Sequence, residues 1–279
     1  MKCYICGSKD VKELFSKIHT HYYKCKVCNV LFQHPQHGKK IKELYERGYY
    51  SNDERKIDQF VNYFSKEKNQ NIIKKIKQHS PNGQLLDIGA GYGYFVKNAK
   101  DAGFEAYGIE PSIDSVKAAK RLLNVKLDCG FFDNKYRKGE LFDVITAFHV
   151  IEHVVNPQLF ITDIRNKLSD GGLLVIETPN IKSFNATFMK EDWPFVIPDE
   201  HLFLFSHKSL KYMLEKNRFK LVYSQRIGPF IHAKRDKKIT NEIRSQKPSW
   251  KMKNIKAVYD FLSKNLMLGD HILMIFEKV

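Results

Sequence analysis

Residues 85–93 read LLDIGAGYG and constrain the fold more than any other part of the chain. A short apolar run ends here in a glycine-rich turn, and residues 92–101 are predicted to form the next helix. Glycine adopts positive φ without steric cost, so such a turn lets the backbone approach a ligand at the carboxyl edge of a sheet. The segment therefore predicts an α/β fold with a ligand site at the end of its first strand.

Strands and helices continue to alternate after this turn. The apolar runs predict strands, with helical periodicity between them. The expected strands cover 84–88, 105–109, 125–128, 142–148, 173–178, 219–225 and 272–278; the expected helices cover 92–101, 112–123, 157–168 and 207–216. Alternation of this kind gives a parallel sheet with right-handed crossovers. We expect one α/β domain over residues 81–279, with Cys129 in its core.

A second feature lies at the N-terminus, where four of the five cysteines fall within the first 28 residues. Their spacing, C-x2-C-x18-C-x2-C, is typical of a tetrahedral zinc site with no position left open for catalysis. Gly7 and Asn29 follow the two pairs and suit the left-handed turn residue of such knuckles. We predict a structural Zn2+ knuckle over residues 1–35, followed by a helical connector or lid over 36–80, with the metal held by Cys3, Cys6, Cys25 and Cys28.

The charge balance leaves two kinds of partner open. Lys and Arg number 47 against 31 Asp and Glu, a formal net charge of +16. The excess is mainly lysine spread along the whole chain, which is typical of a solvated surface but also suits an anionic substrate or nucleic acid. No apolar run is long enough to cross a bilayer, and the N-terminus has no signal-peptide core. We therefore expect a cytoplasmic protein without membrane insertion; the oligomeric state stays open.

Asp87 and the spacing of the glycines help to distinguish between the ligands that a glycine turn can hold, whereas an acid at the position of Glu110 also occurs in NAD-binding proteins. Asp87 lies two residues before Gly89, where a carboxylate would repel a pyrophosphate but would suit an ammonium group or an ordered water. The glycines Gly89, Gly91 and Gly93 read GxGxG rather than the dinucleotide pattern GxGxxG. Glu110 closes the second strand, where it can accept both hydroxyls of a ribose. This set favours S-adenosylmethionine over a dinucleotide.

With these residues in order, the chain resembles class I S-adenosylmethionine-dependent methyltransferases. The matching motifs are LLDIGAGYG, YGIEPS, CGFFD, FDVITAFHVIEHV and GGLLVIETPN. The resemblance implies a Rossmann-like sheet of seven strands in the order 3-2-1-4-5-7-6, with the last strand antiparallel. It also implies cofactor contacts along the carboxyl edge, near the adenine and below the sulfonium, from Pro111, Gly130, Phe131, Phe132, Phe148 and His149.

A narrower resemblance is to bacterial sugar methyltransferases, which also begin with two CxxC pairs. They carry a Glu-His pair at the substrate, matched here by Glu200 and His201. The chain departs from them because it ends soon after the seventh strand, and small quinone-type O-methyltransferases are nearer in length. A histidine suits the removal of one proton near neutral pH. His201 is the first candidate base, with Glu200 to orient it, and His149 and His153 are the others.

We expect methyl transfer to a small-molecule acceptor such as a sugar, a nucleotide-sugar or a surface-polysaccharide precursor. One alternative is an RNA methyltransferase whose knuckle and basic segment 234–256 bind phosphates. Another is a non-catalytic scaffold that binds the cofactor. The aromatic residues Trp193, Phe195 and Phe203 are expected to shape the acceptor pocket.

Overall fold

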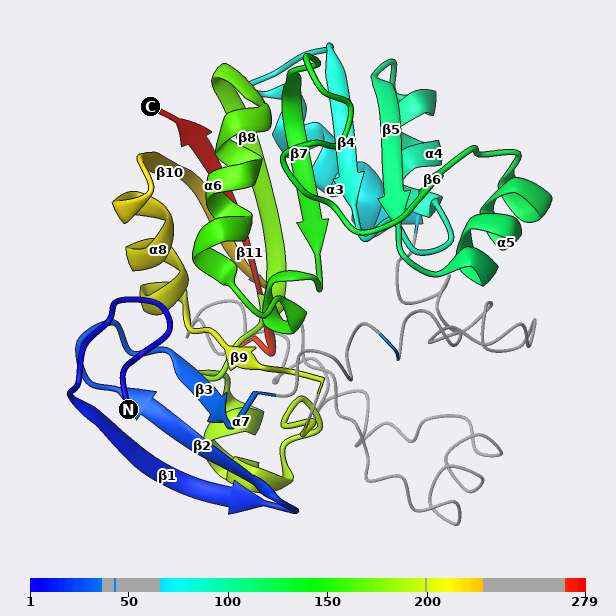
Figure 1. Ribbon diagram of the computed structural model, residues 1–279. Helices are drawn as coiled ribbons and strands as arrows, with labels where there is room; N and C mark the ends of the chain where they lie inside the picture. The colour runs from blue at the N-terminus through cyan, green and yellow to red at the C-terminus, as the bar shows by residue number, and fades with distance from the viewer. Residues whose placement is uncertain (37–42, 44–65, 199, 228–268) are drawn as a thin grey trace, which may run out of the picture.

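The computed structural model describes residues 1–36, 43, 66–198, 200–227 and 269–279 (Figure 1). Most of the predicted connector 36–80 lies outside these residues, except for helix α3 (Lys66–Lys77) and its surroundings. The basic segment 234–256 also lies outside them. Among the described helices, none combines the length and the apolar character that a membrane span requires.

The centre of the fold is a seven-stranded sheet in the order β10-β11-β8-β7-β4-β5-β6. Strand β11 runs antiparallel to both of its neighbours, whereas β6, β5, β4, β7 and β8 are mutually parallel. This is the predicted order 3-2-1-4-5-7-6, so the expected fold class is confirmed. The strands are β4 (Gln84–Ile88), β5 (Glu105–Glu110), β6 (Asp128–Cys129), β7 (Phe142–Phe148), β8 (Leu168–Pro179), β10 (Phe219–Ile227) and β11 (His271–Lys278).

Three sequence predictions need correction. The third strand pairs only over Asp128–Cys129 rather than 125–128. The fifth begins at Leu168 instead of residue 173, because a register shift against β7 accommodates the glycine turn that was expected to precede it. Cys129, expected in the core, is exposed. Its place at the carboxyl end of the edge strand β6 explains the difference.

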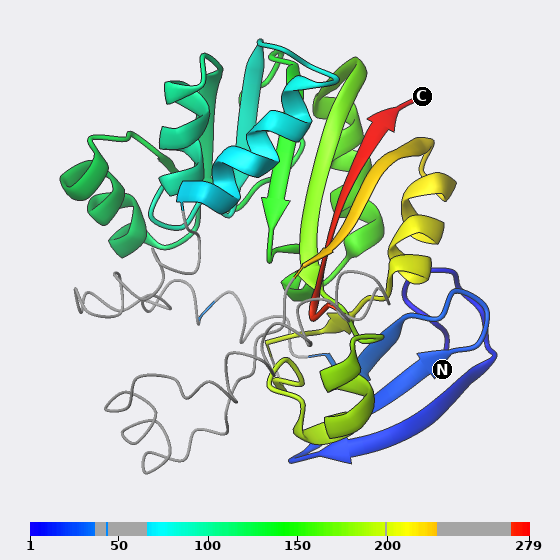
Figure 2. The ribbon, with the colours of Figure 1, turned by 180° about the vertical axis from the view of Figure 1, so that it is seen from behind.

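Helices cover both faces of the sheet because alternate residues of each strand are apolar on both sides. Leu86 and Ile145 face the core under α6 (Pro157–Lys167) and α8 (His207–Lys216). Leu85 and Val144 face the opposite core, under α3, α4 (Tyr94–Asp101) and α5 (Ile113–Leu123) (Figures 1 and 2). The result is a three-layer α/β/α domain.

Side-chain caps fix where several of these helices begin. The hydroxyl of Ser112 accepts a hydrogen bond from the Ser115 amide at the start of α5. Asn156 caps α6 in the same way, with Pro157 at the first helical position. Ser206 and Ser209 form a reciprocal capping box at α8. Each cap satisfies a backbone amide that the helix itself leaves unpaired, so the sequence sets these boundaries locally.

The N-terminal residues form a second, antiparallel sheet of four strands in the order β1-β2-β3-β9. Its first three strands are β1 (Val11–Lys17), β2 (Thr20–Cys25) and β3 (Leu31–His34), but β9 (Phe203–Leu204) comes from the insertion after β8. The insertion also carries α7 (Phe184–Met189) and the 3-10 turn η2 (Lys190–Asp192). This sheet lies beyond the carboxyl ends of the parallel strands (Figure 1).

The two sheets share apolar cores. Phe32 and Phe203 belong to the same buried cluster as the residues under α6 and α8. Trp193 and Tyr22 are fully buried in a third cluster between the N-terminal sheet and the insertion. Burial of these large aromatic rings stabilises the contact, because an aromatic side chain removes a large apolar area from water. The carboxyl edge of the central sheet is therefore enclosed on one side.

Candidate active site

The glycine turn after β4 is held against the end of β5 by backbone and side-chain hydrogen bonds. Gly89, Gly91 and Gly93 have φ of 70°, 53° and 75°, which favours glycine at each position. The amides of Gly89 and Ala90 both donate to the Ile109 carbonyl. A Cβ at Gly89 would lie 2.6 Å from Cγ2 of Val150. The turn is thus closely packed as well as left-handed.

Glu110 links this turn to the start of α5. Its Oε2 accepts a hydrogen bond from the Gly91 amide and its Oε1 from the Ser112 amide, both at 2.9 Å. Burial raises the pKa of Glu110, although the two amides oppose that effect. The carboxylate is thereby fixed at the end of β5, next to the glycine turn.

Asp87 is a second buried acid, in β4 two residues before the turn. Its side chain accepts a hydrogen bond from Oγ1 of Thr146 at 2.6 Å. Burial raises its pKa to about 7, and the charge of Glu110 adds to the effect. Within the described part of the chain, neither Asp87 nor Glu110 forms an ion pair. Two buried acids without a counter-cation fit a ligand that brings a positive charge and hydroxyl groups.

His149 follows β7 and lies between two buried carboxylates. Its Nδ1 is 3.2 Å from Oε1 of Glu152, and its Nε2 is 3.3 Å from Oε1 of Glu177. Burial alone would lower the pKa of His149, but Glu152 and Glu177 together raise it to about 9. The backbone of His149 has a φ of 56°, unusual for a residue other than glycine. A non-glycine residue in this region is often held there by a functional constraint.

His153 and His201 form a neighbouring pair whose rings pack edge to face at 4.7 Å. His201 donates from Nδ1 to the Phe195 carbonyl at 2.8 Å, because that oxygen can only accept. His153 donates from Nδ1 to the Glu200 carbonyl at 3.0 Å. Burial lowers the pKa of His153, and burial lowers that of His201 to about 3. Both rings are therefore neutral at pH 7 with an unprotonated Nε2.

Residues 49–224, more than half of the chain, match the model of a protein family whose description is "Methyltransferase domain". The chain belongs to this methyltransferase family. The mitochondrial ubiquinone biosynthesis O-methyltransferase of Rattus norvegicus is 29% identical over 124 residues, which cover 39% of this chain and 36% of that protein. The enzyme of the same name from Parvibaculum lavamentivorans is 33% identical over 102 residues, covering 35% and 40%. The chain thus matches well under two thirds of either relative's length.

Solved structures agree on the fold. A methyltransferase from Thermotoga maritima, titled a possible histamine N-methyltransferase, has a TM-score of 0.54 at 18% identity, over 86% of this chain and all of that one. Magnesium protoporphyrin IX methyltransferase from Synechocystis, solved with bound SAH, has a TM-score of 0.52 at 12% identity, over 86% and 94%. At these identities the likeness shows the fold alone.

The residues expected near the adenine of this methyltransferase have different surroundings. Phe131 is 47% exposed, whereas Phe132 packs edge to face on Phe160 of α6. Gly130 has a φ of 152° and donates its amide to the Glu110 carbonyl. Pro111 is half-buried next to it. Of these residues, Phe131 has the most exposed ring at the edge where β5 and β6 end.

The aromatic residues expected to shape the acceptor pocket lie in different surroundings. Phe148, which was expected below the sulfonium of the cofactor, packs edge to face on Phe95 of α4 at 4.7 Å. Trp193 and Phe203 are fully buried in the cores that join the two sheets. Phe195 contacts the rings of both His201 and His271. Only Phe195, of the three expected pocket residues, packs directly on the histidines.

Sequence reasoning missed two residues that complete the histidine site. Glu177 interrupts the apolar run near the end of β8, and His271 begins β11; both are only 1% exposed. Lys68 of α3 donates to Oε1 of Glu177 at 2.7 Å. A polar residue at the carboxyl end of an apolar strand was the available signal for Glu177. His271 had no comparable signal, because the antiparallel direction of β11 brings its first residue to this edge.

Four cysteine sulfurs come together at the N-terminus. Cys3 and Cys28 have their Sγ atoms 3.6 Å apart, and Cys6 and Cys25 3.5 Å apart. All four lie within 4.8 Å of one another. Sulfurs on a tetrahedron of bond length about 2.3 Å lie about 3.8 Å apart, so the cluster fits zinc. The predicted left-handed turn residues are confirmed, with φ of 72° at Gly7 and 62° at Asn29.

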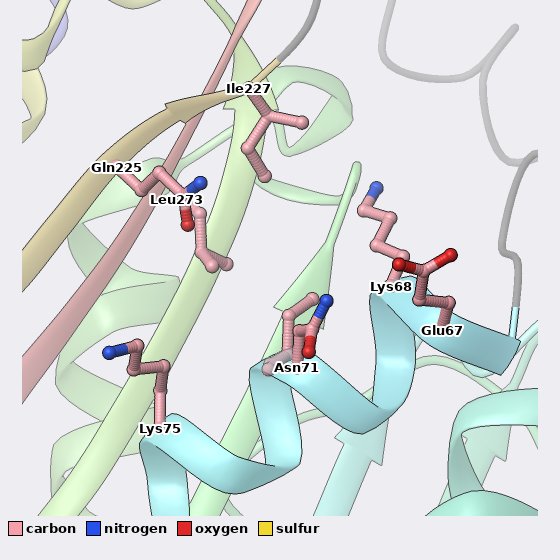
Figure 3. Close-up of a pocket in the computed structure, with 8 residues that line it drawn as sticks. Glu67, Lys68, Asn71, Lys75, Gln225, Ile227 and Leu273 are labelled. Carbon is pink, nitrogen blue, oxygen red and sulfur yellow. The ribbon is translucent and has the colours of Figure 1, made fainter. Parts of the chain in front are cut away.

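A cavity of about 280 Å³ lies between α3 and the strands β10 and β11 (Figure 3). Ile72, Ile227 and Leu273 give it an apolar lining, while Lys68 and Lys75 contribute two ammonium groups. Lys68 also contacts Glu177, so the cavity adjoins the histidine site. Such a combination of apolar surface and a few charged groups is typical of small-molecule sites.

Proposed function

We propose that this methyltransferase transfers the methyl group of S-adenosylmethionine to a small-molecule acceptor: a sugar, a nucleotide-sugar or a surface-polysaccharide precursor. The observation that carries the proposal is the pair of buried acids, Asp87 and Glu110, beside the glycine turn. Neither acid has a cationic partner among the described residues, and a dinucleotide phosphate would be repelled by Asp87 beside the turn. Bound S-adenosylmethionine would supply a methyl group on a sulfonium, together with an ammonium and a ribose.

Each acid has its own task in this proposal. Glu110 accepts hydrogen bonds from the ribose hydroxyls, while its bonds from the Gly91 and Ser112 amides fix its orientation. Asp87 attracts the ammonium group and is itself held by Thr146. The absence of a side chain at Gly91 lets the ligand approach the backbone of the turn. These interactions orient the sulfonium toward the acceptor.

His201 is the proposed base. Its Nδ1–H bond to the Phe195 carbonyl selects the tautomer whose Nε2 carries a lone pair. Nε2 accepts the acceptor's proton; burial disfavours the resulting imidazolium and lowers the pKa of His201, and the charge of Glu152 opposes that effect. His149 has both ring nitrogens directed at carboxylates, which makes it a positioning residue rather than the base. His153 and the backbone of Glu200 support the His201 ring.

The acceptor is proposed to carry negative charge and to enter from the cavity beside α3. Lys75 provides positive charge there, beside Lys68, which pairs with Glu177, and the acidic Glu67. The apolar lining formed by Ile227 and Leu273 suits a sugar ring or an alkyl chain. The four cysteines are proposed to hold one structural Zn2+ that stabilises the N-terminal sheet. That sheet then limits the access of water to the histidines, which favours methyl transfer.

Calorimetry provides the first test. The full chain should bind S-adenosylmethionine and its demethylated product, and should give no heat with NAD. Turnover is then measured with labelled S-adenosylmethionine against nucleotide-sugars, quinols, transfer RNA and ribosomal RNA. Methylated nucleotide-sugar supports the proposal in full. Methylation of RNA or of a quinol alone would contradict the proposed acceptor class. Tight binding of NAD instead of S-adenosylmethionine would contradict the whole proposal.

A further inference from the structure

Three side chains from different strands converge at the junction of the two sheets. His149 follows β7, Glu177 lies in β8 and His271 begins β11. Oε1 of Glu177 is 3.3 Å from Nε2 of His149 and 3.6 Å from Nδ1 of His271. The three atoms that these residues can offer as ligands all lie within 4.8 Å of one another. We call this group the His-Glu-His cluster.

These separations are close to those of a metal site. Ligand atoms on a metal with bonds of about 2.1 Å lie about 3.0 to 3.4 Å apart in octahedral or tetrahedral geometry. Two imidazoles and one carboxylate are a ligand set that divalent transition metals accept, with open positions for other ligands. The chain fixes all three residues at strand ends, so little rearrangement is needed to bring them onto one ion.

Burial provides an independent observation. Glu177 and His271 are each only 1% exposed, and Oε2 of Glu177 has no hydrogen-bond partner in the described structure. A buried carboxylate oxygen without a partner is costly, typically by about 1 to 3 kcal/mol or more. A cation that is bound between the two imidazoles and takes both oxygens of Glu177 would satisfy Oε2 as well as Oε1.

The surroundings of His149 match those of a metal-bound histidine. Its Nδ1 faces Glu152, whose other oxygen accepts a hydrogen bond from Thr178 at 3.0 Å. A carboxylate on the distal nitrogen fixes the ring and the tautomer of a ligating imidazole. Because Glu152 occupies Nδ1 of His149, Nε2 is the nitrogen that faces Glu177 and can bind a metal ion.

We propose that His149, Glu177 and His271 bind a divalent transition-metal ion, separate from the four-cysteine site. Lys68 neutralises Glu177 in the described structure and exchanges with the ion when the metal binds. The positions that the protein leaves open accept an oxygen of the methyl acceptor, a role that rests on the proposed function. The metal binding itself does not depend on that function.

Divalent cobalt is the probe, added to full-length protein that already holds one zinc ion per chain. Cobalt does not displace zinc from thiolates, because zinc binds such sites more tightly. We expect one further equivalent of bound cobalt, measured by equilibrium dialysis. Its visible absorption should show nitrogen and oxygen ligation without a sulfur charge-transfer band. Absence of a second equivalent overturns the proposal.

Matched variants locate the ion. His271→Asn should lose at least about tenfold in cobalt affinity while it keeps its zinc, since a ligand matters at least as much as an outer-shell partner. His79→Asn removes an exposed histidine from the turn after α3 and should bind cobalt like the wild type. Lys68→Met should bind cobalt more tightly, because the competing ammonium is gone. Lys68 is on the outer part of the site, so this variant tests the cluster without altering a ligand.

Two results contradict the proposal: wild-type cobalt affinity in His271→Asn, or unchanged affinity in Lys68→Met. Calorimetry with S-adenosylmethionine on the same samples tests the proposed function separately from the metal site. Cobalt binding without cofactor binding would support the metal site and contradict the proposed function. Cofactor binding without a second bound metal ion would support the proposed function and contradict the metal site.

Discussion

Asp87 allows the cofactor site to be tested through proton release. Burial raises the pKa of Asp87 to about 7, well above its ordinary value of 3.8. Below that pH the acid is mainly protonated in the free protein and cannot attract an ammonium group. Binding of S-adenosylhomocysteine, which keeps the ammonium, should therefore lower the pKa of Asp87 and release a proton.

The size of the effect follows from the pKa. With a pKa of about 7, Asp87 is roughly three-quarters ionised at about pH 7.5 and roughly one-eleventh ionised at about pH 6. The Kd should thus rise roughly eightfold as the pH falls across that range. Calorimetry in two buffers of different ionisation enthalpy counts the released protons. Asp87→Asn should bind more weakly at every pH and show no such slope.

Asp101→Asn is the matched control, because Asp101 is an exposed carboxylate at the end of α4. It should keep the slope of the wild type. Equal slopes in wild type and Asp87→Asn would refute the reasoning, and so would a wild-type Kd that does not change with pH. The free energy of unfolding of the ligand-free protein changes in the opposite direction. Because burial raises the pKa of Asp87 in the folded protein, the unfolded chain ionises first, and the free energy of unfolding falls as the pH rises from about 4 to about 7. Asp87→Asn should lose that decline in thermal unfolding.

Four further predictions concern the glycine turn, the knuckle and the base. Glu110→Gln should raise the Kd for S-adenosylhomocysteine by at least about tenfold in calorimetry, because a charged acceptor of two buried amides is lost. Gly89→Ala should lower the stability by about 1 to 3 kcal/mol in urea unfolding, because its Cβ would lie 2.6 Å from Val150; unchanged stability contradicts this. Cys28→Ser should lose zinc by metal analysis and expose the N-terminal sheet to limited proteolysis, whereas Cys129→Ser should do neither. His201→Asn should lower kcat by about 100-fold or more and leave the KM for S-adenosylmethionine near the wild-type value; a retained kcat would remove His201 as the base.

Much of this protein is determined locally by its sequence. The strand-turn-helix of residues 84–101 follows from apolar periodicity and from glycines that the turn requires. The two cysteine pairs are close in sequence, with only the hairpin of β1 and β2 between them, so their spacing predicted the cluster. The residue types of Gly7 and Asn29 predicted the left-handed turns. The order of seven strands followed from the family resemblance and is confirmed. These features depend on neighbours along the chain or on a motif with fixed spacing.

The histidine site depends on contacts between distant segments, and only the tertiary structure decided it. His201 was expected to be oriented by Glu200, but its Nδ1 is bonded to the carbonyl of Phe195. His271 reaches His149 and Glu177 because β11 runs antiparallel beside β8, which brings residues about 90 to about 120 positions apart to one edge. Strand β9 completes the N-terminal sheet for the same reason, across about 170 residues of chain. No local pattern records such pairings, since they arise when whole elements pack to bury their apolar faces.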